Sequence, residues 1–302
     1  RFVVVYLDDD LLNLPNLYSG WMRKWISMIL KRRNTKALRD CIELCDVLWG
    51  SNDYLLRKYQ KFLINGRCAK SEITADISHM HKVNKREGKE VRILFAGAAD
   101  HAQLLNKYII PAINKISSRF HEVHFTCIGM DRKQILACNV PVTFVPWISN
   151  YDKYREFVEN GGYHIGLAVI EREEFYKCKY YNKFIEYSLL GAVGIYTCSE
   201  PYTLVVRDKE NGFLADATVD SWANAISYAI EHPELCTVCV ENAQKFIRQR
   251  FAQDQVMMEI EKVIPEFSAR HGNYSGDVTY RPRRVWNIMR RLGMGFVDKI
   301  EE

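Results

Sequence analysis

Three polar residues at helical spacing, Lys179, Lys183 and Glu186, form the most informative chemical pattern in the chain. Their spacing of i, i+4 and i+7 places them on one face of a predicted helix over 180–190. Two ammonium groups near the start of a helix would suit a diphosphate, and a carboxylate a turn or two later can accept both hydroxyls of a ribose. The plainer alternative is an exposed helix face on which Lys183 and Glu186 form an ion pair.

Strands alternate with helices on both sides of this segment. We predict strands at 91–96, 122–128, 142–146, 164–169, 193–197 and 212–215, and helices at 102–118, 150–159, 180–190, 218–231, 233–250 and 254–265. This alternation indicates a parallel sheet with helices on both faces. Ligands of such folds bind beside the carboxyl ends of the strands, which is where the polar face of helix 180–190 is expected.

The residues before position 91 repeat this pattern only in part. Strands are predicted at 2–7, 46–51 and 62–64, helices at 20–45 and 53–60, and a polar linker at 67–90. A nucleotide-binding fold normally needs about 100–150 residues. The predicted fold class is therefore α/β, with one complete doubly wound (Rossmann-like) parallel-sheet domain at 90–265, preceded by a partial one at 1–89 and followed by a tail at 266–302. Since a buried strand starts directly after Arg1, we expect the chain to be a fragment.

Composition excludes several other classes of protein. A chain with 48% hydrophobic and 26% charged residues is globular and not disordered or collagen-like. Every stretch long enough to span a bilayer contains charged or strongly polar residues, so no transmembrane helix is predicted. The net charge of +5 is too small to indicate nucleic-acid binding. Nine scattered cysteines fit a reducing cytosol better than a secreted disulfide framework.

The motifs of the second domain resemble those of group 1 glycosyltransferases of the GT-B fold (glycosyltransferase family 4-like). Many of these carry a K-S-x-x-K-F-x-E-Y-x-x-L-G pattern, a strand, a loop with proline and then N-G-x-L. The matching residues here are Lys179, Lys183, Phe184, Glu186, Tyr187, Leu190, Gly191, Pro201, Asn211, Gly212 and Leu214. The resemblance also includes Gly97 and His101, similar to a G-x-x-x-H opening, and Ile165–Ala168, similar to an I-G-L-A-P strand. It covers about 90–265 in order, which is far more specific than one glycine-rich loop.

This resemblance implies roles for individual residues. Glu186 would hold the nucleotide ribose, and Lys179, with Lys183 beside it, would contact the diphosphate or the donor sugar. Gly97 would let the backbone approach the phosphates. Trp147 lies where the base usually stacks, although a rim aromatic of the core is an equal alternative. The remaining donor-site residues implied are those of the loop Pro201, Tyr202 and Thr203, which would offer backbone N–H groups to phosphate or sugar, and His101 as a phosphate contact or a packing residue at a helix start.

The chain also departs from the family pattern. Many relatives have a glutamate seven residues before the one at Glu186, but Cys178 stands there. That contact with the donor sugar is therefore absent or supplied by Glu171, Glu173 or Glu174. An Arg/Lys pair often found in the first loop of the second domain is replaced by residues 98–101.

The acidic cluster Asp8–Asp10 follows the first strand and allows three interpretations. Acids at a strand end hold a divalent metal in GT-A glycosyltransferases. The segment is more similar to a D-D-D-L-F-x-L-P stretch of some group 1 enzymes, which borders the acceptor cleft without a metal. The acids could also cap a helix or simply face water.

The predicted function is transfer of a sugar from a nucleotide-diphosphate donor to a glycan or lipid-linked acceptor. The resemblance implies that the reaction retains the anomeric configuration of the sugar and needs no metal or other cofactor. Cell-surface polysaccharide synthesis is the expected process. A non-catalytic nucleotide-sugar-binding or scaffold module and a sugar-nucleotide epimerase remain alternatives. The basic segment 281–291 predicts either a helix that braces the first domain or contact with the inner face of a membrane, so the expected location is cytoplasmic or peripheral.

Overall fold

The computed structural model describes residues 2–13, 35–86, 88–98, 101–171 and 173–270. Residues 1–264 form one compact unit and residues 265–302 a second, of which a short helix, α11 (Glu266–Arg270), is described. The tail segment 281–291 and most of the predicted helix 20–45 lie outside the described residues, although 35–43 are helical. Among the described residues, no helix is long and apolar enough to cross a membrane.

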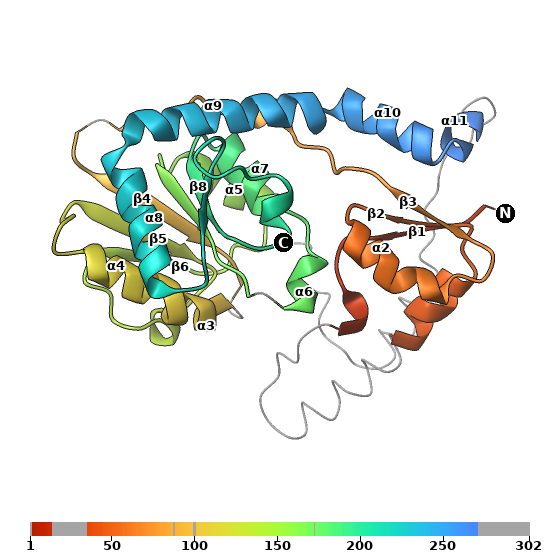
Figure 1. Cartoon of the computed structure of the whole chain (residues 1–302), viewed down its shortest axis with the longest axis horizontal. Coiled ribbons are helices and arrows are strands. Elements are labelled where there is room, and N and C mark those ends of the chain that lie inside the picture. The colour runs from red at the N-terminus through yellow and green to blue at the C-terminus, as the bar shows by residue number, and fades with distance from the viewer. Residues whose placement is uncertain (1, 14–34, 87, 99–100, 172, 271–302) are drawn as a thin grey trace, which may run out of the picture. The chain divides into compact units, whose positions relative to one another are not determined.

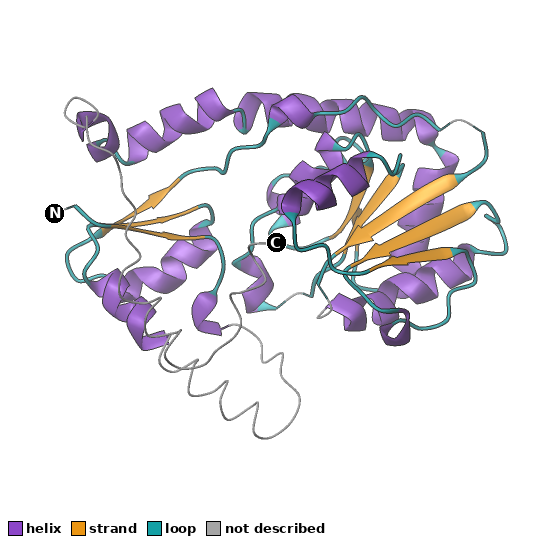
Figure 2. Ribbon diagram, turned by 180° about the vertical axis from the view of Figure 1, so that it is seen from behind, coloured by secondary structure: helices purple, strands orange, loops and turns teal. Residues whose placement is uncertain are grey.

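A six-stranded parallel sheet is the centre of the second half of the chain (Figures 1 and 2). Its strands are β4 (Val91–Ala96), β5 (Val123–Ile128), β6 (Val142–Val145), β7 (Ile165–Ala168), β8 (Val193–Thr197) and β9 (Phe213–Ala215). They lie in the order β6-β5-β4-β7-β8-β9. Both faces of the central strands are buried, which explains why the sequences of these strands consist almost entirely of apolar residues.

Helices cover both faces of this sheet. The helices of this half of the chain are α3 (Ala102–Leu104), α4 (Ile110–Ile116), α5 (Tyr151–Glu159), α6 (Glu174–Lys177), α7 (Asn182–Leu189), α8 (Val219–Glu231), α9 (Pro233–Arg250) and α10 (Gln253–Val263), of which α10 packs on α9 and not on this sheet. On β4, Ile93 and Phe95 join a core cluster that continues into α4 and α8, whereas Leu94 and Ala96 join a second cluster with α7 and the end of α9. The predicted doubly wound domain is confirmed, and β4, β8 and α9 have the predicted bounds.

One helix of this domain contains an irregular turn. Between α3 and α4 lies a π-helical turn, η5 (Leu105–Ile109), in which the Ile110 N–H donates to the Leu105 carbonyl. The next residue, Pro111, has no N–H to give to the carbonyl four residues earlier, so the regular α-helical pattern cannot pass through this point.

The first half of the chain forms a smaller parallel sheet. It consists of β1 (Val4–Leu7), β2 (Val47–Gly50) and β3 (Arg67–Lys70) in that order, with α2 (Asp53–Tyr59) packed on it. A separate core includes Leu7, Leu48, Leu55 and Tyr59. The expectation of a partial domain of the same kind is therefore confirmed.

The third strand of this sheet lies where the sequence predicted a linker. Residues 62–64, predicted as a strand, begin with the last residue of the 3-10 turn η2 (Gln60–Phe62) and are not in the sheet. The strand is instead β3, at the start of the segment 67–90. Its sequence Arg-Cys-Ala-Lys has only Ala69 fully buried, because β3 is an edge strand. An edge strand of this kind lacks the apolar run on which the prediction depended.

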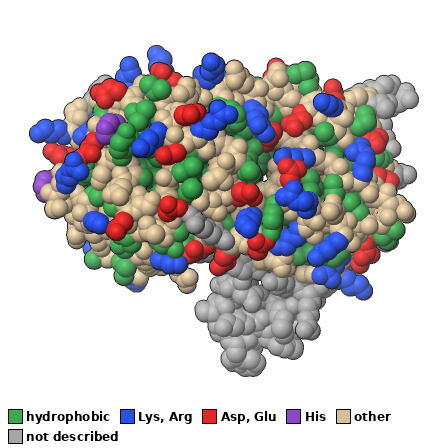
Figure 3. All heavy atoms as spheres, viewed as in Figure 1, with side chains coloured by type: hydrophobic (Ala, Val, Ile, Leu, Met, Phe, Trp, Pro, Cys, Tyr) green, Lys and Arg blue, Asp and Glu red, His purple; other side chains and the backbone are tan. Residues whose placement is uncertain are grey.

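Acidic and basic side chains are interspersed among one another on the face drawn in Figure 3, as expected from the small net charge.

Candidate active site

Two of the predicted donor-site residues, Gly97 for the phosphates and Trp147 for the base, follow the carboxyl ends of strands of the large sheet. The chain passes from β4 to β5 and β6 on one side and then to β7 and β8 on the other, so the switch point lies between β4 and β7. Ligands of open α/β sheets bind outside the strand ends at such a point. Gly97 directly follows β4, and Trp147 comes shortly after the end of β6.

Two glycines pack against each other at the carboxyl ends of the strands. Gly129, which follows β5, has a φ of +87°, and a Cβ atom there would lie 2.0 Å from the Gly97 carbonyl oxygen and 3.3 Å from Cε3 of Trp147. Gly97, Gly129 and Trp147 therefore form one surface. The Trp147 side chain is 65% exposed, which leaves its indole ring accessible to a flat ligand. His101 also belongs here, because its Cδ2 lies 3.4 Å from a Cβ placed on Gly97.

Glu186 and Lys183 are brought together on α7 with a tyrosine from α5. The Lys183 Nζ lies 2.6 Å from Oε2 of Glu186, and the Tyr154 hydroxyl donates to Oε1. Lys183 also donates to the Tyr154 oxygen at 3.3 Å. Burial, with the charge of Glu186 as the second cause, raises the pKa of Tyr154, so its hydroxyl stays protonated and remains a donor. The ion pair offered as the plainer alternative is present, and it is half-buried.

The Glu186 carboxylate retains capacity for a ligand. Each oxygen accepts one of these hydrogen bonds and has a further lone pair. The side chain is also partly exposed. Two remaining acceptor positions on adjacent oxygens match the two hydroxyls of a ribose.

The loop after β8 is more closed than the sequence predicted. The Tyr202 and Thr203 N–H groups, expected to face the donor, both donate to the Ser199 carbonyl, at 3.0 and 3.2 Å. Pro201 and Tyr202 are buried, and the Tyr202 ring lies 4.9 Å from that of Tyr196. Burial and then the charge of Glu186 raise the pKa of Tyr202. Tyr202 thus belongs to the aromatic packing behind Glu186.

Lys179 does not share the helical face with Lys183 and Glu186, so this part of the prediction is wrong. The helix α7 begins at Asn182, after the residues that follow Lys179. The Lys179 ammonium instead lies 3.2 Å from Oδ2 of Asp9, just after β1. The physical reason is that the backbone around Lys179 is fixed elsewhere: the Asn52 side-chain amide donates to the carbonyls of Lys177 and Lys179, at 2.8 and 2.9 Å.

The position that departs from the family pattern has a packing role. Cys178 is buried in the core cluster of the three-stranded sheet, and burial raises the pKa of its thiol to about 11. Two of the acids considered as replacements for a glutamate here are engaged with lysines: Glu171 with Lys107 at 3.0 Å and Glu174 with Lys177 at 2.9 Å.

The acidic cluster after β1 is held by hydrogen bonds. Asp10 is fully buried and accepts from Lys58 at 2.5 Å, from the Tyr59 hydroxyl at 2.8 Å and from Asn13. Asp9 pairs with Lys179. In the part of the chain that the structure describes, no three His, Cys, Asp or Glu side chains are grouped so that they could hold a metal ion.

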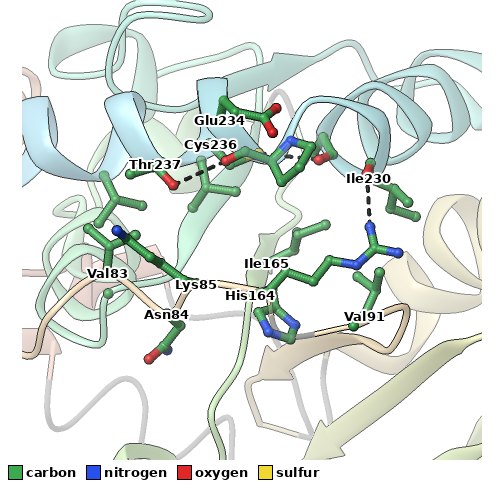
Figure 4. Close-up of a pocket in the computed structure, with 17 residues that line it drawn as sticks. Val83, Asn84, Lys85, Val91, His164, Ile165, Ile230, Glu234, Cys236 and Thr237 are labelled. Carbon is green, nitrogen blue, oxygen red and sulfur yellow. Dashed lines mark hydrogen bonds between the residues drawn. The ribbon is translucent and has the colours of Figure 1, made fainter.

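A cavity of about 490 Å³ lies at the other end of the strands, where their amino ends are. Its lining includes Val91, Ile165 and Val193, the first residues of β4, β7 and β8. Figure 4 shows Lys85, His164 and Glu234 around it. Burial and nearby arginines lower the pKa of His164, which favours a neutral imidazole. None of the predicted donor-site residues lines this cavity.

Three residues of the candidate site were not found from the sequence. The signal for Gly129 is its place directly after the strand β5, since Gly97 directly follows the strand β4 in the same way. Tyr154 and Asn52 gave no such signal, because their partners Glu186 and Lys179 lie far away in the sequence.

Comparison with known proteins gives a result for structure but not for sequence. No family model and no curated protein matches the chain. Sucrose-phosphate synthase from Thermosynechococcus elongatus is similar in structure, with a TM-score of 0.57, 13% identity and coverage of 79% of this chain and 62% of its own. TarM has a TM-score of 0.61 at 9% identity, with coverage of 86% and 49%. HepE from Anabaena, in complex with UDP-glucose, has a TM-score of 0.61 at 13% identity, with coverage of 89% and 72%.

The chain spans 62% and 49% of the length of the first two of these proteins. A likeness at such low identity concerns the course of the backbone and the arrangement of the strands. The resemblance inferred from the motifs is therefore confirmed at the level of structure: the chain has the fold of the GT-B glycosyltransferases, with one complete parallel-sheet domain and a smaller one before it.

Proposed function

We propose that this chain binds a nucleotide-diphosphate sugar and transfers the sugar to an acceptor. The observation that carries this proposal is the Glu186 carboxylate, held by Lys183 and Tyr154 with one acceptor position left on each oxygen. The fold supports it, because HepE of the same fold has been solved with UDP-glucose.

Each part of the donor then has a partner of suitable chemistry. The ribose hydroxyls donate to Glu186, and the base stacks on the exposed face of Trp147. The phosphates approach the backbone at Gly97, which has no side chain of its own, with His101 beside it. Lys179 and Lys183 provide positive charge for the diphosphate. Negative charge accumulates on the diphosphate as the bond to the sugar breaks, so the ammonium groups stabilise the transition state more than the bound donor.

The finer features of the reaction follow from the motif resemblance. We propose that the enzyme retains the anomeric configuration, acts without a metal or other cofactor, and uses a glycan or lipid-linked acceptor in cell-surface polysaccharide synthesis. We further propose that it works in the cytoplasm, at the inner face of the membrane.

Calorimetric titration of the chain with UDP, GDP and their sugar conjugates, with and without Mg²⁺, tests the proposal. We expect the chain to bind the nucleotides of one base, uracil or guanine. Glu186→Ala should abolish this binding, because the ribose hydroxyls lose their acceptor. The matched control is Glu90→Ala, which removes an exposed carboxylate that pairs with Arg92 at 3.0 Å and has no assigned part in the donor site. Equal binding by Glu186→Ala and by the unaltered chain would contradict the proposed site.

A further inference from the structure

Glu72 is a buried carboxylate that the proposed mechanism does not use. Its side chain is 4% exposed and it lies two residues after the end of β3. Its Oε2 accepts hydrogen bonds from the hydroxyls of Tyr180, at 2.8 Å, and Tyr181. Its Oε1 accepts from Nε of Arg250, at 2.9 Å, and from Nη2 of the same guanidinium.

These four donors explain how the charge can be buried. An isolated carboxylate in this position would be very costly, whereas charge-assisted hydrogen bonds offset the loss of water. Burial raises the pKa of both tyrosines, and the charge of Glu72 contributes, so their hydroxyls remain protonated donors. Glu72 therefore joins two segments that are far apart in sequence, the tyrosine pair and the end of α9.

The tyrosine pair directly follows Lys179 in the chain. On the other side of Lys179, the Asn52 amide holds the carbonyls of Lys177 and Lys179. The backbone of this segment is thus fixed at both ends, while the Lys179 side chain is partly exposed and reaches Asp9. A fixed backbone limits the positions that the Lys179 ammonium can take.

We propose that Glu72 is a positioning residue, which holds Tyr180 and Tyr181 so that Lys179 presents its ammonium group to the diphosphate of the donor. This inference rests on the proposed function. A charged group held in place before the ligand arrives loses less freedom on binding, so the contact contributes more to affinity.

Glu72→Gln tests this role in the full chain. The variant is expected to fold, because the Arg250 side chain is 48% exposed and can turn toward water. We expect the affinity for the nucleoside diphosphate to fall about tenfold and that for the monophosphate to change less than about twofold, since the monophosphate lacks the group that Lys179 contacts. Asp53→Asn, which removes an exposed acid paired with Lys70 of β3, is the matched control and should change neither.

A double-mutant cycle separates positioning from a general structural role. In a Lys179→Met background, Glu72→Gln should cause no further loss of diphosphate affinity. Equal losses for the diphosphate and the monophosphate, or losses that add fully, would overturn the proposal. Tyr181→Phe keeps the Glu72–Arg250 pair, and by the same reasoning it should weaken diphosphate binding selectively. If Glu72→Gln proves unfolded, this variant decides the question.

A measurement without nucleotide keeps the test independent of the proposed function. Lysines carrying ¹³C-methyl groups give separate NMR signals, and the signal lost in Lys179→Met identifies Lys179. We expect this signal to move in Glu72→Gln and to stay in place in Asp53→Asn. A chain that binds no nucleotide but shows this movement would contradict the proposed function and keep the positioning role, whereas an unmoved signal would overturn that role.

Discussion

The Lys179 ammonium is paired with Asp9, at 3.2 Å, across 170 positions of sequence. The same ammonium is the group that the proposed mechanism assigns to the diphosphate of the donor. Asp9 thus occupies, with its own negative charge, the partner position that a phosphate would take. A bound diphosphate must either displace the carboxylate or share the ammonium with it.

We therefore expect Asp9→Asn to strengthen binding of the nucleoside diphosphate. Both side chains are partly exposed, and ion pairs of this kind contribute about 0.2–1 kcal/mol, so the gain in affinity should be at most about fivefold. Calorimetric titration measures it. Asp53→Asn, which removes a comparable exposed pair with Lys70, should leave the affinity unchanged. Weaker binding by Asp9→Asn would show that Asp9 itself contributes to the donor site.

Tyr154→Phe tests how Glu186 is oriented. The variant removes one donor from the carboxylate but keeps the ring, and a hydrogen bond to a charged group is worth about 1.5 kcal/mol, or about tenfold in affinity. We expect this loss for a nucleoside diphosphate and a much smaller one for its 2′-deoxy analogue, which lacks one of the hydroxyls assigned to Glu186. Tyr151→Phe, which removes the hydroxyl of an exposed tyrosine at the first residue of the same helix, is the control. Equal losses for both nucleotides would place the ribose away from Glu186.

The large sheet was predictable from the sequence because its strands are buried on both faces. A strand such as Val91–Ala96 consists mainly of apolar residues and ends at glycine, so its bounds follow from composition. The edge strand β3 has no such signal, so its composition predicts a linker there. For the candidate site, the pairing of Lys183 with Glu186 follows from helical spacing. The partners of Lys179 do not, since contacts across such sequence separations depend on how the two sheets are connected.

Gly129 is the position at the candidate site where an added methyl group should be most destabilising. Its positive φ costs an alanine about 1–2 kcal/mol, and the Cβ would also lie 2.0 Å from the Gly97 carbonyl oxygen. We expect Gly129→Ala to lower the free energy of unfolding by about 3 kcal/mol in urea denaturation. Gly88→Ala isolates the backbone cost, because Gly88 has a similar φ of +84° and nothing within 4 Å of its Cβ position. Equal losses in the two variants would show that the Gly97 carbonyl moves away freely.

Buried thiols should make the protein less stable in alkaline solution. Burial raises the pKa of four cysteines from 9.0 to about 11 or 12: Cys127, Cys178, Cys236 and Cys239. Above pH 9 the unfolded chain loses these protons while the folded chain keeps them, so the unfolded state binds fewer protons and the free energy of unfolding falls as the pH rises. Stability from this source is complete below pH 9 and is lost progressively toward pH 11 or 12.

Urea denaturation under reducing conditions at about pH 7.5, 9 and 10 measures this dependence. Cys127→Ala should reduce the slope between the two higher pH values, because one thiol that titrates only in the unfolded chain is removed. Cys41→Ala, which removes an exposed thiol, is the control for the loss of one cysteine as such. A slope that Cys127→Ala does not change would mean that the thiol at this position titrates in the folded protein as it does in water.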